Sequence, residues 1–326
     1  MDCQLSYYLL DDMRGCDDLT ELFKTAVICA VIFVNGATDA PNSISGAVAS
    51  GALKYRGACI VCAVFNFIGL ALSYAFLPAV ARTVSELSAA DSTVPLLTVV
   101  IFASIAWALG VPTSESHALL AAMGGVSLYT FGTTGGKFID VCIKSFASCA
   151  AGFAAGGALT VFTYSLFSRR RRVRKSFQIF SAALSSACHG MQDGQKFVCL
   201  LVPSAVGAKL PMSAVILCAA VMAAGCLTGG RKITETVGSG MISGDISTLN
   251  AVSDLGAVAC TLASSVFGIP ISTTYMKTCS LLGAASAKKA PVIKPIVLKF
   301  ILTWVLTYPA CMGIAYVLSA ISHAAF

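Results

Sequence analysis

The sequence predicts an all-α polytopic membrane protein, and three observations support this class. Of the 326 residues, 57% are hydrophobic and 11% are charged, and the mean hydropathy is +0.83, outside the usual range of soluble globular proteins. The charges lie between apolar runs that can cross about 30 Å of hydrocarbon as helices, namely 57–81, 92–114, 145–168, 210–230, 255–276 and 300–326. Strands of a membrane barrel would be only about 10 residues long, with alternating polarity.

Charge at the two ends of the first half orients the spans. The segment 1–21 is acidic and lacks the basic start and small-residue cleavage site of a signal peptide. The segment 169–175 is the strongest basic run, and positive charge favours the cytoplasmic side. We therefore expect an extracytoplasmic segment 1–21 and a basic cytoplasmic linker 169–175, in a protein of the inner or plasma membrane. The net charge of +7 comes largely from short loops, so it indicates topology and predicts no nucleic-acid partner.

The fourteen cysteines are mostly single residues inside apolar runs, which is typical of small buried side chains. Cys59 and Cys62 form the one metal-like spacing, and no second pair accompanies them. We predict no structural metal.

Two transmembrane repeats of inverted topology are predicted, one over 22–168 and one over 176–326. Each should contain a broken span, a plain span, a re-entrant helical hairpin and a final span, and both termini should be extracytoplasmic. The first repeat is divided into 22–53, 57–77, 94–128 and 138–167, and the second into 176–208, 211–228, 246–283 and 296–320. Pro112 follows Asp39 by 73 residues and Pro270 follows Asp193 by 77, so both landmarks recur in order.

Each repeat carries an aspartate where the membrane would otherwise be uncharged. Asp39 lies between uncharged stretches, and Gly36, Pro41 and Gly46 predict that its helix is interrupted. Asp193 lies in a similar Gly-x-x-Asp motif, so a second interruption is expected over 188–196. Ionisable residues at membrane depth are costly and usually functional.

Broken helices at corresponding positions predict a binding site near the membrane midplane. Exposed helix N-termini favour anions, and the two proline turns add the hydroxyls of Ser114, Ser116, Ser272, Thr273 and Thr274. The two aspartates can take up Na⁺ or H⁺, so the pattern indicates a cation-coupled anion symporter.

Structural interpretations of the same residues remain open. Asp193 could simply pair with Lys196, and the hydroxyls could bond to helix carbonyls. His117 and His189 are either satisfied interior histidines or proton-linked groups. Glu115 lies in a hairpin turn, either at the membrane edge or in the cavity.

These motifs resemble the inorganic phosphate transporter family of PiT-type permeases. The resemblance rests on Asn35-Gly36-Ala37-Thr38-Asp39 with Asn42, on 189–196, and on the turns 112–117 and 270–275. It covers about 22–318. Departures are Thr38 and Gln192 in place of asparagines, Asn66 in place of an acid, Glu115 in place of a threonine and Tyr275 in place of a histidine.

The resemblance implies a role for each site residue. Substrate binding is expected at Ser114, Ser116, Ser272, Thr273, Thr274, Gln195 and Lys196. Cation coupling is expected at Asn35, Asp39, Asn42, Asp193 and Asp254, with Na⁺ held by Asp39 and Asp193.

The function implied is secondary transport of inorganic phosphate, free or as a metal–phosphate complex, driven by Na⁺ or H⁺. No other cofactor is expected, the protein is not expected to be an enzyme, and membrane lipid and a homodimeric partner are compatible with the resemblance. Sulfate or another oxyanion is the close alternative. From a different class, two intramembrane aspartates could form an aspartyl protease, although the usual sequence contexts are absent. A non-transporting phosphate sensor would bind the anion without flux.

Overall fold

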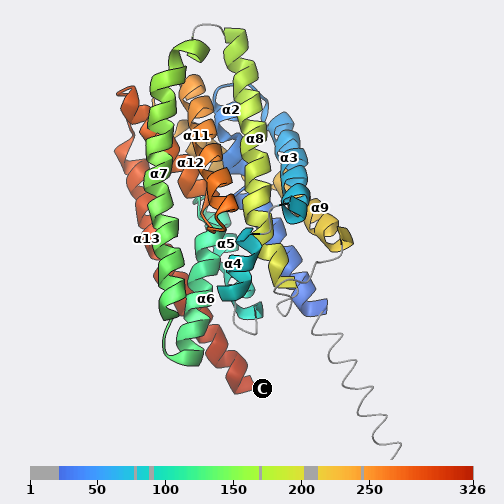
Figure 1. Cartoon of the computed structure of the whole chain (residues 1–326). Coiled ribbons are helices and arrows are strands. Elements are labelled where there is room, and N and C mark those ends of the chain that lie inside the picture. The colour runs from blue at the N-terminus through green and yellow to red at the C-terminus, as the bar shows by residue number, and fades with distance from the viewer. Residues whose placement is uncertain are drawn as a thin grey trace, which may run out of the picture.

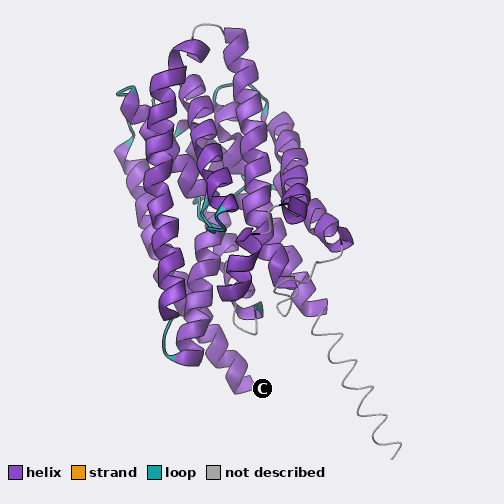
Figure 2. Ribbon diagram, viewed as in Figure 1, coloured by secondary structure: helices purple, strands orange, loops and turns teal. Residues whose placement is uncertain are grey.

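The computed structural model describes residues 22–76, 79–87, 92–168, 171–201, 212–243 and 246–325. Helices make up nearly all of this part of the chain (Figures 1 and 2), and a single isolated bridge joins Ile242 to Val292. A helix over 22–38 is followed by α2 (Pro41–Ala49), α3 (Tyr55–Phe76), α4 (Ala79–Leu87), α5 (Thr93–Leu109), α6 (Glu115–Phe131), α7 (Gly135–Ser168), α8 (Arg171–Val198), η1 (Cys199–Leu201), α9 (Met212–Thr228), α10 (Arg231–Ser239), α11 (Ile246–Val266), α12 (Thr273–Ala287) and α13 (Lys294–Ala325). The predicted all-α class is confirmed.

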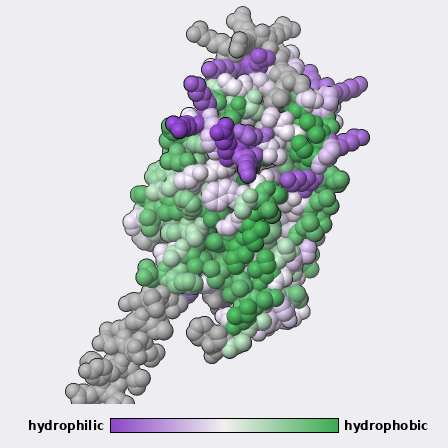
Figure 3. Space-filling model, turned by 180° about the vertical axis from the view of Figure 1, so that it is seen from behind, coloured by the Kyte–Doolittle hydropathy of each residue, from purple (hydrophilic) through white to green (hydrophobic). Residues whose placement is uncertain are grey.

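Five of the described helices, or six if one bent pair counts as a single span, are long and apolar enough to cross a membrane. The long helices α7 and α13 expose large apolar side chains such as Phe162 and Val305. On the face shown in Figure 3, hydrophilic side chains gather at one end and a broad hydrophobic region lies beyond them. This surface suits lipid, so the chain is an integral membrane protein.

Both re-entrant hairpins form where the proline turns predict them. Gly110 ends α5 with a φ of 65°, and the Ser114 hydroxyl caps α6 by accepting from the His117 N–H at 3.3 Å. Gly268 follows α11 with a φ of 67°, and the Ser272 hydroxyl caps α12 by accepting from the Tyr275 N–H at 3.2 Å. Glycine is suited to these left-handed positions, and the matching serine caps start the second arm of each hairpin in the same way.

The first aspartate interrupts its helix, but the second does not. The helix over 22–38 ends at a turn containing Asp39, and Pro41 is the first residue of α2. The interruption predicted over 188–196 is wrong, because α8 runs unbroken from Arg171 to Val198. No proline lies there to remove a backbone donor, and Gly190 packs against the Asn66 carbonyl. The break of the second half lies between α9 and α10 instead, with a bend of 74°.

Two short helices of nine residues each, α4 and α10, lie between longer ones. Arg82 and Glu86 belong to α4, and Glu86 pairs with Lys137. Asp91 and Lys209 lie outside the described residues, as does the segment 1–21. Residues 171–175 of the predicted basic linker form the start of α8.

The arrangement is consistent with two inverted repeats, and the two halves interlock. In Figure 1 the start of α7 and the end of α13 lie at one end of the molecule, and the end of α7 and the start of α8 lie at the opposite end. Each half packs on the other, with α7 against α12, α6 against α13, and α3 against α8. Glycines allow these backbones to approach: a side chain at Gly36 would meet the Met222 carbonyl, and one at Gly283 would meet the Phe153 carbonyl.

Candidate functional site

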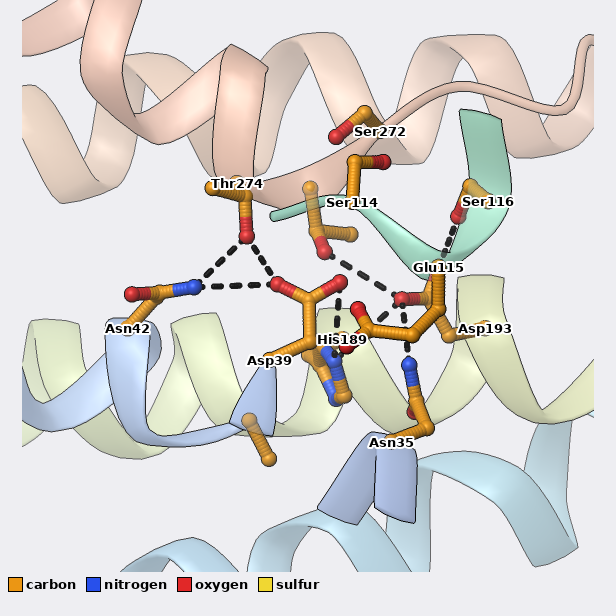
Figure 4. A network of polar contacts seen from close by, with 12 residues as sticks. Asn35, Asp39, Asn42, Ser114, Glu115, Ser116, His189, Asp193, Ser272 and Thr274 are labelled. Atoms are coloured by element: carbon orange, nitrogen blue, oxygen red, sulfur yellow. Dashed lines mark hydrogen bonds and ion pairs between the residues drawn. The ribbon is translucent and has the colours of Figure 1, made fainter. Parts of the chain in front are cut away.

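The buried centre of the molecule brings together the two aspartate motifs and the two hairpin turns (Figure 4). Asp39 comes from the turn before α2 and Asp193 from α8. Ser114 and Ser272, at the starts of α6 and α12, lie near one another on the other side of the carboxylates. Segments that are far apart in the sequence therefore form one polar cluster inside the membrane protein.

Asp39 is held by a neighbour from its own motif and by the second hairpin. Asn42 donates to Asp39 Oδ1 at 3.0 Å and to Thr274 Oγ1 at 2.6 Å. Thr274 in turn donates its hydroxyl to Asp39 Oδ1. Asn42, three positions after Asp39, thus joins this aspartate to the Thr274 hydroxyl of the second repeat.

Asp193 has the same arrangement with the first hairpin. Lys196, three positions after it, donates to Asp193 Oδ1 at 2.5 Å, to Ser116 Oγ at 2.6 Å and to the Ile271 carbonyl. Ser116 donates to Asp193 Oδ1 at 3.2 Å, and Thr273 donates to Oδ2 at 3.4 Å. The ion pair that the sequence offered as a structural alternative exists, but it is embedded in the predicted site.

The two motifs also contact each other. Asn35, four positions before Asp39, approaches Asp193, and His189, four positions before Asp193, approaches Asp39. Asn35 donates to Asp193 Oδ2 at 3.4 Å. His189 Nε2 lies 3.2 Å from Asp193 Oδ2 and 4.0 Å from Asp39 Oδ2. The contacts of the two motifs therefore correspond pairwise, as expected for an internal repeat.

The proton on His189 can be placed from its other neighbour. The Asn66 amide donates to the Cys62 carbonyl at 2.8 Å, which leaves its Oδ1 facing His189 Nδ1 at 2.6 Å. An amide oxygen only accepts, so Nδ1 carries a proton, and Nε2 is the ring nitrogen that faces the two carboxylates. Asn66, at the position where the resemblance places an acid, thus orients this histidine.

Three potential ligand atoms converge at the centre. The ligand atoms of Asp39, His189 and Asp193 lie within 4.8 Å of one another, and all three residues are buried. Asp39 Oδ2 has no hydrogen-bond partner in the described part of the chain, and His189 Nε2 faces Asp193 Oδ2 at 3.2 Å. Buried acceptors without donors are costly, so this arrangement suits a cation or a proton.

Glu115 lies in the cluster and not at the membrane edge. Its side chain is 1% exposed, and Thr38 donates to its Oε1 at 2.5 Å. Glu115 is the first residue of α6, where the helix dipole favours a negative charge. Its carboxyl group also lies against that of Asp39, and its Oε2 has no assigned donor among the described residues.

Four of the predicted site residues are not part of these contacts, and two of them, Ser114 and Ser272, use their hydroxyls to cap their own helices. Gln195 donates to the Met191 carbonyl within its own helix. Asp254 pairs with Lys277, a residue that the sequence analysis did not single out. The argument that identified Asp39, a lone charge within an apolar run, also applies to Lys277, because Lys277 is the only charged residue between 255 and 287.

The other candidate histidine is an ordinary interior residue. His117 Nε2 lies 2.7 Å from Ser145 Oγ, and its ring packs edge-on against Tyr275 with the centroids 4.2 Å apart. Of the two histidines, His189 alone contacts the aspartates in the described structure.

A cavity reaches from the central cluster along α8, α11 and α12. Its lining residues are Asp39, Asn42, Ser43, Ser185, Cys188, His189, Ala257, Val258, Thr261, Thr273 and Lys277. Small, hydroxyl and charged side chains give this cavity a polar lining.

Comparison with known proteins gives consistent results. The profile of the phosphate transporter family matches twice, over 35–177 and 167–315. A probable low-affinity inorganic phosphate transporter of Bacillus subtilis (strain 168) is 30% identical over 327 residues, covering 92% of this chain and 98% of the relative. One of Mycobacterium tuberculosis (strain ATCC 25618 / H37Rv) is 29% identical over 310 residues, covering 88% and 74%. Among solved structures, the sodium-dependent phosphate transporter aligns with a TM-score of 0.78 at 16% identity, covering 94% of this chain and 99% of that one.

Proposed function

Because the chain belongs to the phosphate transporter family, we propose that it is a symporter that carries inorganic phosphate across the cell membrane with Na⁺ or H⁺. The observation that carries this proposal is the convergence of Asp39, His189 and Asp193 beside the starts of two helices. Such a centre offers acceptors to a cation and N–H groups to an anion. The relatives are named as transporters, so the transporter class is preferred to the protease alternative.

The charges of the cluster provide a reason for coupling. Three buried carboxyl groups, those of Asp39, Glu115 and Asp193, lie in the cluster with the ammonium of Lys196 and the imidazole of His189. A phosphate dianion entering this centre alone would meet net negative charge in a poorly screened environment. A cation between Asp39 Oδ2, Asp193 Oδ2 and His189 Nε2 would reduce that repulsion.

Lys196 would link the two binding events. Its ammonium now donates to Asp193 and Ser116. When a cation neutralises Asp193, the ammonium becomes available to the phosphate, together with the hydroxyls of Ser116 and Thr274. Cation binding therefore prepares the anion site, which is the requirement for symport.

The hydrogen-bonding character of the site favours phosphate over sulfate. Glu115 Oε2 is a buried acceptor without a donor in the described structure. Hydrogen phosphate carries an O–H that can donate to it, whereas sulfate has only acceptors and would face the carboxylate without a proton. The printed name of the solved neighbour, a sodium-dependent phosphate transporter, makes Na⁺ the first cation to test.

The test is uptake of labelled phosphate and labelled sulfate into proteoliposomes under an imposed Na⁺ gradient or pH gradient. We expect phosphate uptake that follows one of the two gradients, and loss of gradient-dependent uptake in Asp39→Asn. The matched control is Asp140→Asn, because Asp140 is exposed and pairs with Lys144 on the surface. Uptake of sulfate alone would refute the substrate, and gradient-independent uptake would refute symport.

A further inference from the structure

A second buried ion pair lies away from the central cluster, within the second hairpin. Lys277 of α12 pairs with Asp254 Oδ1 of α11, and their side chains are 3% and 0% exposed. Gln178 and Ser181 of α8 donate to Asp254 Oδ2 at 3.5 and 3.4 Å. The carboxylate is therefore supported from two elements.

The ammonium is less well supported than its partner. A lysine ammonium has three donors, and the contact with Asp254 is the one interaction that Lys277 Nζ makes in the described part of the chain. Buried donors without acceptors are costly, most of all on a charged group. Lys277 also lines the cavity that reaches Asp39 and His189, so an anion in this cavity could satisfy the remaining donors.

The polar groups between the two sites lie on one face of α8. Gln178, Ser181, Ser185 and His189 follow one another at intervals of three or four residues, which places them on the same side of a helix. With a rise of 1.5 Å per residue, Ser181 lies about 12 Å from His189 along the axis. This face leads from the central cluster toward the basic start of α8, at the end of the molecule where α7 and α8 meet (Figure 1).

Neighbouring elements continue the same lining. Thr273 and Lys277 are four residues apart on α12, and Val258 and Thr261 of α11 lie one and two turns beyond Asp254. Thr273 contacts Asp193 of the central cluster. Asp39 of the central cluster and Lys277 therefore line the same cavity.

We propose that Lys277 is a second oxyanion-binding residue, which holds the anion between the central cluster and the basic end of the molecule. In the absence of substrate, Asp254 is its counter-ion, and an entering or leaving oxyanion takes the place of that carboxylate on the ammonium. The identity of the anion as phosphate rests on the proposed function. If the pair only fastens α11 to α12, no anion binds there.

The experiment follows protection of a single cysteine by inorganic phosphate. Ser185 lines the cavity between the two sites, so Ser185→Cys is introduced after the fourteen native cysteines are replaced, and its reaction with a small maleimide is measured in purified protein at constant ionic strength. Two matched double variants remove one ion pair each without leaving an unpaired buried charge. They are Asp254→Asn with Lys277→Gln, and Asp193→Asn with Lys196→Gln.

We expect phosphate to protect Ser185→Cys in the parent protein and in the Asp193/Lys196 double variant. In the Asp254/Lys277 double variant, the phosphate concentration for half-protection should rise about tenfold or more, as expected for loss of a charged hydrogen bond. Equal protection with and without Lys277, or none in the parent, would overturn the proposal. If phosphate protects Ser185→Cys in a protein that shows no phosphate uptake, the result would contradict symport but would still support anion binding at Lys277.

Discussion

At the scale of single residues, Glu115 distinguishes this site most clearly from the family pattern described above. Its position in a turn left two locations open in the sequence, because a turn residue faces water or the cavity according to how the hairpin packs. Thr38, from the first repeat, holds the carboxylate in the cluster at 2.5 Å. That contact joins residues 77 positions apart, which no local pattern could predict.

We expect Glu115→Gln to weaken discrimination between phosphate and sulfate. Glutamine retains an acceptor for the Thr38 hydroxyl and removes the negative charge that an anion without a proton must face. Inhibition of phosphate uptake by sulfate should therefore strengthen by about tenfold or more in the variant. Glu86→Gln, on the surface beside Lys137, is the control, and an unchanged sulfate inhibition constant in Glu115→Gln would show that the carboxylate does not select the anion.

The remaining centre was partly accessible from sequence. The motif repeat identified Asp39 and Asp193, together with the hydroxyl residues that contact them. The roles of Asn66 and Lys277 were not accessible, because they depend on which helices become neighbours. His189 was only one of two open candidates until Asn66 and the two carboxylates were found around it.

At the scale of elements, glycine and proline proved to have different consequences. Pro41 coincides with a helix start, whereas Gly190 and Gly194 lie inside the continuous α8. Glycine lowers helix propensity, but it also lets two helices pack closely. A sequence motif alone does not show whether a glycine breaks its helix or packs against a neighbour. The break predicted in the second half failed for this reason.

We expect Gly190→Ala to destabilise the protein by about 1–3 kcal/mol, the usual cost of overpacking. A methyl group there would meet the Asn66 carbonyl, so α3 and α8 would have to separate. Gly313→Ala is the matched control, because α13 leaves open space at that position, and it should be neutral or slightly stabilising. Thermal unfolding in detergent, followed by a thiol-reactive dye on the buried cysteines, measures both, and equal melting temperatures would contradict the close contact.

At the scale of the whole molecule, the inverted repeat followed from the order of two aspartates and two prolines, but the interlocking of the halves did not. Sequence spacing shows which segments of the two repeats correspond to each other, but it does not show which segments pack together. The pairing of α7 with α12 and of α6 with α13 depends on small residues such as Gly125 and Gly283, which have no distinctive pattern in an apolar chain.

The inverted arrangement predicts opposite access to its two hairpin turns. Ser114 and Ser272 are 0% and 1% exposed, so the described conformation is closed around them. In membranes, with the native cysteines replaced, Ser114→Cys should react with an impermeant thiol reagent from outside and Ser272→Cys from inside, and saturating phosphate should slow both. Labelling of both from one side only, without protection, would contradict two hairpins that meet at a shared substrate.

The contact between Asp39 and Thr274 also has a consequence for biosynthesis. The two residues are 235 positions apart, so at about 5–20 residues per second the ribosome completes Thr274 roughly 10–50 s after Asp39. The first repeat therefore enters the bilayer before the hydroxyl partner of its aspartate exists, and before α12 is available to cover α7. During that interval the nascent half must keep its carboxylate hydrated or protonated, so the insertion machinery has to retain the early helices near a polar surface until the second half arrives.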